Sequence, residues 1–514
     1  MADAAVVGSG PNGLAAAVTL ARAGLSVRVY EAEDSIGGGS RTLELGLPGH
    51  RHDIGAAVHP MALASPFFRE IGLADRVDFI VPEVSYAHPL PDGRTGLAWR
   101  DLERTAEGLG SAGPAYERLF GPLVRAYGSV TDLVLHPLLR MPHGLDGLGA
   151  TAAFGVRAAA LSVPAPVLNS AAGMLPPLLG GAGWGGAGGK DVEAMAALLA
   201  GVRAHNAGGG AGPAANGAAL VLGTAAHATG WPIPLGGSQA IPNALAMDLI
   251  DHGGRIETGR RVERIADLEE ELVFCDTSPE DLARIAGAVL PEGYRNRLLA
   301  TRRGPGSCVV HYVLDGPVPW RDPDIALAGT VHLGGTAADI RRWELDQRGP
   351  GSRRGAGGRG RRAGAGSGPG IGGGHGPYVI VSQPSLFDPS RAPAGHHVLW
   401  AYCHVPFGSP ADMTEAITAQ LEAAAPGFRD TVVHSEAMTA PGLQARNANL
   451  VGGDISGGAV DLAGMLSRPV LAASPWRTPA RGLYLCSSST PPGPAVHGMC
   501  GHLAARTALK DLAG

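Results

Sequence analysis

Residues 6–31 read V-V-G-S-G-P-N-G-L-A-A-A-V-T-L-A-R-A-G-L-S-V-R-V-Y-E, and this stretch decides the fold. A short apolar strand over residues 4–7 runs into a turn of the form G-x-G-x-x-G. A helix rich in alanine and leucine follows as far as Gly24, and a second strand over residues 27–30 ends on Glu31. A strand, a glycine turn, a helix and a second strand that ends in an acid are the parts of a dinucleotide-binding unit.

Each glycine of the turn has a physical role in such a unit. Gly8 permits the tight turn, Gly10 lets the backbone approach a pyrophosphate, and Gly13 lets the helix pack closely on the strand. The start of the helix offers free N–H groups and a partial positive charge to the phosphates. The expected dinucleotide contacts are therefore Gly8, Gly10, Pro11, Asn12, Gly13, Glu31 and Ala32.

Glu31 indicates which dinucleotides fit this unit. Its carboxylate can accept hydrogen bonds from both hydroxyls of a ribose, and its charge would repel a 2′-phosphate. The acid therefore favours FAD or NAD over NADP.

A second glycine cluster narrows the choice to FAD. Gly37, Gly38 and Gly39 come shortly after Glu31 and are followed by Ser40 and Arg41. An NAD site requires no glycines here, whereas in flavoproteins they let the chain cross close to the phosphates and the ribityl chain. We expect FAD contacts from Gly38, Gly39, Ser40 and Arg41.

Two later segments fit the same cofactor. Residues 482–486 predict a strand, followed by a loop of small residues and a helix that starts near Val496 or His497. The dipole of that helix would stabilise the charge that reduction places on the flavin. Residues 254–265 alternate like a pair of strands, and the backbone near Val262 would meet the adenine. Each segment alone could equally be an ordinary buried strand. The contacts expected here are Val262, Val496, Gly498 and Met499.

These motifs together resemble the FAD-dependent oxidoreductases of the phytoene-desaturase-like group, within the amine-oxidase and glutathione-reductase-type flavoproteins. The resemblance implies an α/β fold with a discontinuous FAD-binding Rossmann domain of the glutathione-reductase type, an antiparallel-sheet substrate domain and a helical insertion. It covers both ends of the chain and much of the middle, and it says little about the substrate. Further matching motifs are G-W-P-I-P-L-G-G-S-Q-A-I (230–241), G-G-D-I (452–455), L-Y-L-C-S-S-S-T-P-P-G (483–493) and H-G-M-C-G (497–501).

Two places depart from the pattern of that group. Gly39 stands where desaturases and amine oxidases usually have an arginine, and Arg41 comes two residues later, so the resemblance does not fix its flavin contact. Pro494 and Ala495 stand where relatives tend to have glycines, which stiffens the approach to the flavin.

The candidate catalytic residues are two histidines. A flavin carries the redox step itself, so the protein mainly has to place a substrate C–H over flavin N5. His59 and His497 are the titratable candidates near the flavin, although each is more often a hydrogen-bonded structural histidine. Asp454 is expected to fix a loop or to bind a ribityl hydroxyl rather than to transfer protons.

Composition excludes several other classes of protein. The chain has 514 residues, a net charge of −5 and 17% charged residues, so no general basic field recruits nucleic acid. Its five cysteines are scattered without a C-x-x-C, which implies no disulfide framework, metal site or redox pair. We expect no signal peptide and no membrane span, and hence a cytoplasmic protein, with peripheral membrane contact left open. The Ala/Gly-rich, Lys-poor composition is typical of a high-GC bacterial genome.

The expected organisation is a discontinuous FAD-binding domain over residues 1–60, 231–302 and 440–514. Residues 61–230 predict a mainly helical substrate or lid region, with helices over 115–139, 192–205 and 214–229. Residues 303–439 predict a substrate domain, with strands over 307–314, 378–383 and 396–404 and a helix over 413–425.

Two stretches do not fit a packed core. The apolar, Pro/Gly-broken stretch 162–189 could be a mobile lid or a surface that touches lipid, and a poorly packed loop is the simpler interpretation. The Arg/Gly-rich stretch 348–376 predicts a disordered loop. A solvated insertion and an out-of-frame segment compete for it, and both are favoured over loose RNA binding, so we expect no nucleic-acid partner.

The sequence therefore predicts an FAD-dependent oxidoreductase that dehydrogenates or desaturates a small apolar, elongated, isoprenoid-like substrate. Oxygen, a quinone or a similar electron acceptor would fit, and the oligomeric state is open. A flavin-dependent isomerase without net redox change is one alternative. A lipid-binding or escort protein on the same fold is another, although the intact Gly8, Gly10, Gly13 and Glu31 disfavour it.

Overall fold

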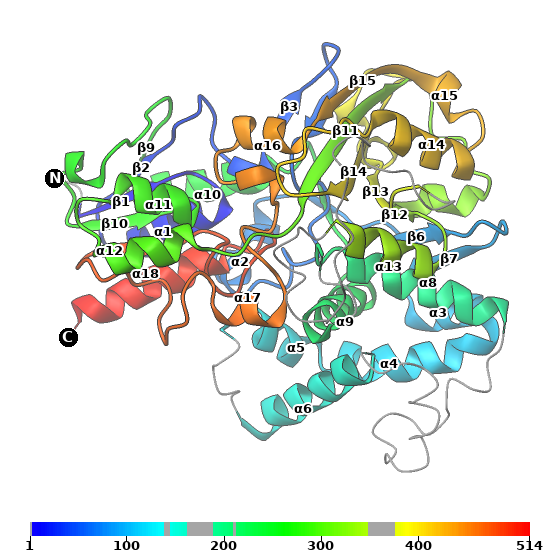
Figure 1. The fold of residues 1–514 in the computed structure, drawn as a ribbon, viewed down its shortest axis with the longest axis horizontal. Coiled ribbons are helices and arrows are strands. Elements are labelled where there is room, and N and C mark those ends of the chain that lie inside the picture. The colour runs from blue at the N-terminus through cyan, green and yellow to red at the C-terminus, as the bar shows by residue number, and fades with distance from the viewer. Residues whose placement is uncertain (1–2, 138–143, 162–188, 209–211, 348–375, 514) are drawn as a thin grey trace, which may run out of the picture.

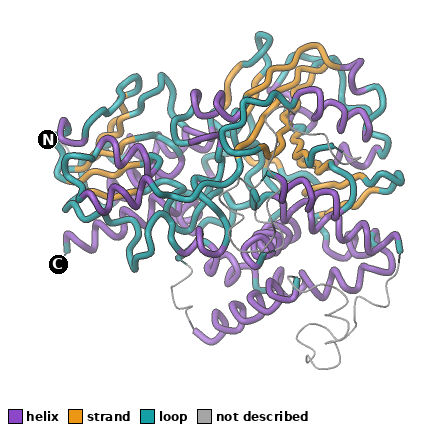
Figure 2. The backbone as a smooth tube through the Cα atoms, viewed as in Figure 1, coloured by secondary structure: helices purple, strands orange, loops and turns teal. Residues whose placement is uncertain are grey.

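The computed structural model describes residues 3–137, 144–161, 189–208, 212–347 and 376–513. A five-stranded sheet lies beside both chain termini, and a seven-stranded sheet lies at the other end of the molecule, with a group of helices along one side of it (Figure 1, Figure 2). Almost all of the stretches 162–189 and 348–376 falls outside the described residues, so the predictions made for them stay untested.

The five-stranded sheet is parallel and has the strand order β16-β10-β1-β2-β9. Its strands come from three distant parts of the chain, as the discontinuous domain requires, while the exact domain boundaries stay a prediction. The first two strands have the predicted bounds. The five are β1 (Ala4–Val7), β2 (Val27–Tyr30), β9 (Arg255–Glu257), β10 (Leu272–Cys275) and β16 (Leu483–Leu485).

Helices cover both faces of this sheet. Ala4 and Val6 of β1 pack with α1 (Pro11–Arg22), α10 (Ala240–Asp251) and α18 (Met499–Leu512). Ala5 and Val7 point the other way and pack with α11 (Pro279–Ile285) and α12 (Glu292–Leu299). Because both faces are buried, β1 is an uninterrupted apolar run rather than an alternating one.

The seven-stranded sheet has the order β15-β11-β14-β13-β12-β6-β7 and is antiparallel except between β12 and β6. The three predicted strands are confirmed as β11, β13 and β14. The strands are β6 (Val84–Pro89), β7 (Thr95–Trp99), β11 (Gly306–Leu314), β12 (Ala328–Leu333), β13 (Val379–Ser382), β14 (His397–Val405) and β15 (Val432–Met438).

The two faces of the seven-stranded sheet differ in what covers them. Val310 and Tyr312 lie on the face that packs with α14 (Thr414–Ala424), which confirms the helix predicted over 413–425. Val309 and Tyr402 lie on the opposite face, which packs in part with α8 (Lys190–Ala204). This second face is the one that the candidate site uses.

The helices found within residues 61–230 agree in part with those predicted from the sequence. The predicted helix over 115–139 is two helices, α4 and α5, which meet at the non-helical Ala126. The helices predicted over 192–205 and 214–229 are confirmed as α8 and α9. The region also contributes the hairpin of β6 and β7, which the helical pattern did not predict. The helices are α3 (Leu102–Gly108), α4 (Gly113–Arg125), α5 (Tyr127–Val134), α6 (Gly144–Ala160), α8 (Lys190–Ala204) and α9 (Pro213–Ala228).

Two sequence-based bounds are wrong. The strand pair expected over 254–265 is only β9, because Gly259 has a φ of 66° and turns the chain, which leaves Val262 in a loop. The last helix begins at Met499 rather than near Val496, because Gly498 before it has a φ of 66°.

The remaining elements connect these layers. No helix in the described ranges combines the length and the hydropathy that crossing a bilayer requires. The five cysteines are buried free thiols. The shorter elements are β3 (Thr42–Glu44), β4 (Arg51–Asp53), β5 (Phe79–Ile80), β8 (Ile233–Pro234), α2 (Pro66–Glu70), α13 (Ala337–Asp346), α15 (Phe428–Thr431), α16 (Ala440–Arg446) and α17 (Leu462–Leu466).

Candidate active site

A cavity of about 740 Å³ extends from the glycine loop of the parallel sheet to the second face of the seven-stranded sheet. We call the part lined by residues 7–61, 260–285 and 443–497 the cofactor half. The substrate half is the part whose described lining residues lie between positions 134 and 231 or between 307 and 402. Among the predicted site residues, the cavity is lined by Gly8, Gly10, Pro11, Asn12, Glu31, Ala32, Gly38, Gly39, Ser40, Arg41, His59, Val262, Val496 and His497.

The other predicted residues, Gly13, Asp454, Gly498 and Met499, lie behind this lining rather than in it. Gly13 acts through packing. A Cβ at this position would lie 2.2 Å from the carbonyl oxygen of Gly8, so only glycine lets α1 sit this close to the loop. This contact is the role that the sequence assigned to Gly13.

Asp276 is a residue that the sequence analysis did not select. It follows β10 directly, is buried, and its Oδ2 accepts a hydrogen bond of 2.9 Å from the backbone N–H of Gly13 in the first turn of α1. Burial raises the pKa of the Asp276 carboxyl to about 7, the N–H of Gly13 opposes the rise, and the charge of Glu31 adds to it. A titratable carboxyl therefore occupies the helix start where a diphosphate would bind.

Glu31 is buried and already engaged by the glycine loop. Its Oε2 accepts hydrogen bonds of 2.9 Å from the Ser9 N–H and 2.5 Å from the Ser9 hydroxyl. Its Oε1 accepts the N–H of Glu33 at 2.9 Å. The carboxylate thus ties the end of β2 to the loop, and each oxygen keeps further acceptor capacity for a ribose hydroxyl.

The second glycine cluster lies against the first. The N–H of Gly37 donates to the carbonyl of Ser9 at 3.0 Å, and a Cβ on Gly38 would lie 3.0 Å from the Cα of Gly10. The close approach that the sequence predicts here is therefore backbone on backbone.

Arg41 lies at the edge of the cofactor half and is buried. Its guanidinium donates to the carbonyl oxygens of Gly38 at 3.2 Å and Arg446 at 2.8 Å, and lies 3.7 Å from Glu33 Oε2. Four more arginines also line the cavity, so cationic groups surround the site of an anionic cofactor. They are Arg260, Arg261, Arg284 and Arg446.

His59 is a neutral histidine in the cavity wall. Its Nε2 lies 2.7 Å from the Ser238 hydroxyl, and that hydroxyl donates its own proton to the carbonyl of Ala56 at 2.6 Å. His59 must then donate from Nε2, and its Nδ1 is a buried acceptor without a protein partner among the described residues. Burial lowers the pKa of His59 to about 4.

His497 has a structural role in the loop just before α18. Its Nδ1 accepts the N–H of Met499 at 3.0 Å, and the carbonyl of His497 accepts the Ser65 hydroxyl at 2.6 Å. Burial lowers the pKa of His497 to about 4. The ring thereby caps α18 and fixes the loop before it.

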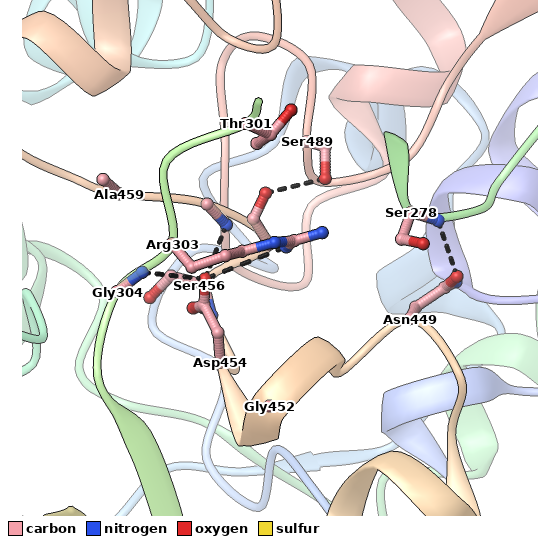
Figure 3. A network of polar contacts seen from close by, with 12 residues as sticks. Ser278, Thr301, Arg303, Gly304, Asn449, Gly452, Asp454, Ser456, Ala459 and Ser489 are labelled. Carbon is pink, nitrogen blue, oxygen red and sulfur yellow. Dashed lines mark hydrogen bonds and ion pairs between the residues drawn. The ribbon is translucent and has the colours of Figure 1, made fainter. Parts of the chain in front are cut away.

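Asp454 holds a loop together, as one of the two sequence-based interpretations had it (Figure 3). Its buried carboxylate accepts three backbone N–H groups, those of Gly304 at 3.0 Å, Ser456 at 2.9 Å and Gly458 at 3.0 Å. Arg303 lies 3.8 Å from its Oδ2. The next residues of this loop, from Ile455 on, line the cavity, so Asp454 positions the wall without reaching it.

Arg468 is a second residue that the sequence did not reveal. It is buried, and its guanidinium donates to the carbonyls of Ser488 at 2.8 Å and of Ser456, both of which line the cavity. Burial lowers the pKa of Arg468 to about 10, and the charge of Asp454 opposes that shift. One cation thus joins two loops of the cofactor half.

The substrate half is mostly apolar. The described side chains that line it include no Asp, Glu, Lys or Arg, whereas the acids that line the cavity all lie in the cofactor half. His205 is one polar exception, and its Nε2 lies 2.8 Å from the Nε2 of the buried His332. The apolar walls include Leu135, Phe154, Val221, Leu222, Trp231 and Ile380.

The residues of the cofactor half fit FAD. The close glycine contacts mean that backbone, not side chains, surrounds the expected position of the diphosphate. Glu31 offers hydrogen-bond acceptors to a ribose, and the arginines supply positive charge for the anionic cofactor. Asp276 is the acid at the helix start itself, where its charge opposes the fit, and its raised pKa lessens that opposition.

Comparison with known proteins agrees with this reading of the fold. Residues 6–71 match the model of the NAD(P)-binding Rossmann-like domain. Pyridine nucleotide-disulfide oxidoreductase domain-containing protein 2 of Mus musculus is 36% identical over 148 residues, which are 26% of this chain and 25% of that protein. The match thus spans about a quarter of that relative. Phytoene dehydrogenase of Streptomyces griseus is 28% identical over 425 residues, 78% of this chain and 72% of that protein.

Solved structures match over the whole chain. A triple mutant of putrescine oxidase has a TM-score of 0.57 at 16% identity, covering 100% of this chain and 99% of that one. Cyclohexylamine oxidase from Brevibacterium oxydans IH-35A has a TM-score of 0.55 at 15% identity, with 100% of both chains covered. The chain is thus similar in sequence to a phytoene dehydrogenase and shares its fold with amine oxidases.

Proposed function

We propose that this protein is an FAD-dependent oxidoreductase that dehydrogenates an apolar, elongated substrate. The observation that carries the proposal is the single cavity that joins the glycine loop to a mostly apolar chamber. When bound, FAD supplies the acceptor for a hydride. The residues that would hold it are those of the two glycine clusters, Glu31 and Arg41 in the cofactor half.

The protein's own side chains would orient the reactants rather than move protons. His59 is neutral at physiological pH because burial lowers its pKa to about 4, so it can accept a hydrogen bond at Nδ1 but does not retain a proton there. The ring of His497 is committed to the start of α18. This arrangement suits hydride removal from a carbon that needs no strong base.

The chemistry of the substrate half favours an uncharged substrate over an amine. An ammonium group entering a buried chamber needs a carboxylate partner, and the described lining of this half offers none. The proposal therefore follows the phytoene dehydrogenase relative rather than the amine oxidases that share the fold. An isoprenoid-like skeleton is consistent with the apolar walls.

A peripheral contact with lipid is part of this proposal. Leu462 of α17 lines the cavity and is 50% exposed, and Leu471 beyond it is 71% exposed. Apolar side chains that are exposed beside a cavity wall would let an apolar substrate enter from a membrane surface. Oxygen or a quinone would serve as electron acceptor.

Two alternatives use the same cavity. A flavin-dependent isomerase would leave the mass of its product equal to that of its substrate. An escort protein would bind lipid without any flavin chemistry, and the intact glycine loop and Glu31 disfavour it.

The test begins with the purified protein. We expect the absorption bands of oxidised flavin, FAD released on denaturation, and anaerobic bleaching by a member of a panel of apolar alcohols, aldehydes and polyenes. A colourless protein that cannot be reconstituted with FAD would contradict the proposal. Flavin that no substrate bleaches, with product and substrate of equal mass, would point to the isomerase.

A further inference from the structure

The floor of the substrate half carries a row of polar side chains across three strands. Thr330 of β12 pairs with Ser382 of β13, which pairs with Trp400 of β14. All three line the cavity. Residues opposite one another on neighbouring strands point to the same side of a sheet, so these side chains face the same space.

Two of these groups have no hydrogen-bond partner in the part of the chain that the structure describes. The Ser382 hydroxyl and the Trp400 indole N–H are buried, and neither makes a hydrogen bond with the described residues. Ile380 and Tyr402 are the neighbours on the same face, two residues along each strand, and they are mostly apolar. The row thus leaves one hydroxyl and one N–H to bind something else, and the Ser307 hydroxyl of β11, which also lines this half, is likewise buried without a partner among the described residues.

An entirely hydrocarbon ligand would offer no hydrogen-bond partner to the Ser382 hydroxyl and the Trp400 N–H. Water can satisfy both groups while the chamber is open, but a hydrocarbon that displaces the water leaves a buried donor and a buried hydroxyl unpaired. A ligand oxygen can accept from the indole N–H and exchange a hydrogen bond with the hydroxyl. A site built in this way rejects the analogue that lacks the oxygen.

The charges around the row favour a neutral oxygen. Trp400 pairs on its other side with His311 of β11, and His311 pairs with Glu436 of β15. Burial lowers the pKa of His311 well below its ordinary value, and the carboxylate of Glu436 lies 3.9 Å from Arg446. Glu436 and Arg446 therefore compensate one another and the buried His311 ring is neutral, so no uncompensated charge at this end of the row favours a carboxylate or an ammonium ligand.

We propose that the substrate carries a hydroxyl or carbonyl group, and that Ser382 and Trp400 bind it in the substrate half. The inference rests on the proposed function, because it concerns the same cavity and the same reaction. It changes the expected substrate class from a pure hydrocarbon to an apolar alcohol, aldehyde or ketone. Ser382 and Trp400 are specificity-determining residues in this account.

The test compares ligands with one skeleton and different end groups on the FAD-loaded protein. Geraniol and geranial offer a neutral oxygen, 2,6-dimethyl-2,6-octadiene offers none, and geranic acid and geranylamine carry a charge. Calorimetry gives the dissociation constants. We expect geraniol or geranial to bind about tenfold more tightly than the hydrocarbon, since one additional net hydrogen bond is worth about that factor. Equal affinities, or tighter binding of the acid or the amine, would overturn the inference.

Variants assign the effect to the two side chains. Ser382→Ala and Trp400→Phe should each reduce the alcohol-to-hydrocarbon ratio several-fold while leaving hydrocarbon affinity within about twofold. Trp343→Phe is the matched control, because its indole donates to the carbonyl of His404 and does not line the cavity. A ratio unchanged in both site variants would contradict the assignment. Flavin content is recorded in every sample, so a failure of FAD binding is distinguished from a failure of ligand selection.

Discussion

The Oδ2 of Asp276 accepts the backbone N–H of Gly13 at 2.9 Å, across 263 positions of the sequence. This bond joins the end of β10 to the first turn of α1, and a carboxylate there satisfies a helix N–H that a cofactor phosphate would otherwise use. A diphosphate and an ionised Asp276 repel each other, so the protonated form of Asp276 is the one compatible with tight cofactor binding.

FAD affinity should therefore depend on pH through Asp276. Its pKa of about 7 means that the carboxyl is protonated below that pH, so FAD binding is strongest there and weakens by up to about tenfold per pH unit above it. Asp276→Asn should bind FAD with a much flatter pH profile. Titration of the apoprotein at several pH values checks this, and a wild-type affinity that rises above neutral pH would contradict it.

The ionisation of Asp276 should also change the free energy of unfolding in a stated direction. The pKa of Asp276 in the folded protein lies above the ordinary aspartate value of 3.8, so ionisation of Asp276 opposes folding. Its contribution to the free energy of unfolding therefore falls as pH rises from about 4 to 7, with a limiting slope of about 1.4 kcal/mol per pH unit. Denaturation of the apoprotein and of Asp276→Asn at matched pH isolates this contribution, and parallel profiles for the two proteins would exclude it.

Gly501 should tolerate no larger residue. It lies in α18, and a Cβ there would lie 1.7 Å from the carbonyl oxygen of Asn12 at the start of α1. Since backbone must move, Gly501→Ala should destabilise the protein by about 3 kcal/mol. Gly155→Ala is the control, because this glycine of α6 has nothing within 4 Å of its Cβ position and should gain about 0.5–1 kcal/mol. Similar melting temperatures for both variants would refute the packing argument.

Ala495 should be improved by glycine. It has a φ of 135°, the one positive φ outside glycine among the described residues, in the loop where relatives tend to have glycines. Release of this strain outweighs the added freedom of the unfolded chain, so Ala495→Gly should stabilise by on the order of 1 kcal/mol. Ala495→Val should destabilise, and thermal melting that ranks the two variants the other way would contradict the assignment.

Local patterns explain which parts of the fold the sequence could predict. The strands around the glycine turn and the buried strands over 307–404 are continuous in sequence, and their apolar residues alone indicate them. The alternating residues 254–265 indicate a pair of strands, but only β9 forms, because the positive φ of Gly259 turns the chain. The hairpin of β6 and β7 could have been found from the P-D-G turn at 91–93 between two short apolar runs.

Some residues of the candidate site could be identified from the sequence, and others only from the fold. Gly8, Gly10 and Glu31 belong to one short motif, so spacing identified them. Asp276 meets Gly13 only through the fold, although its place at the end of a parallel strand beside β1 is a signal that could have been used. Ser382 and Trp400 become neighbours only through strand register, which the sequence does not specify.

The most direct test of the account is an FAD titration of the apoprotein and of Glu31→Ala. We predict one FAD per chain for the wild type and an affinity about a hundredfold lower for the variant, because two charge-assisted hydrogen bonds to the ribose are lost. Glu31→Asp should retain part of the affinity. Asp34→Ala is the matched control, since this acid of the same loop is exposed and does not line the cavity. Equal FAD affinity of the wild type and Glu31→Ala would show that the cofactor does not bind at this loop.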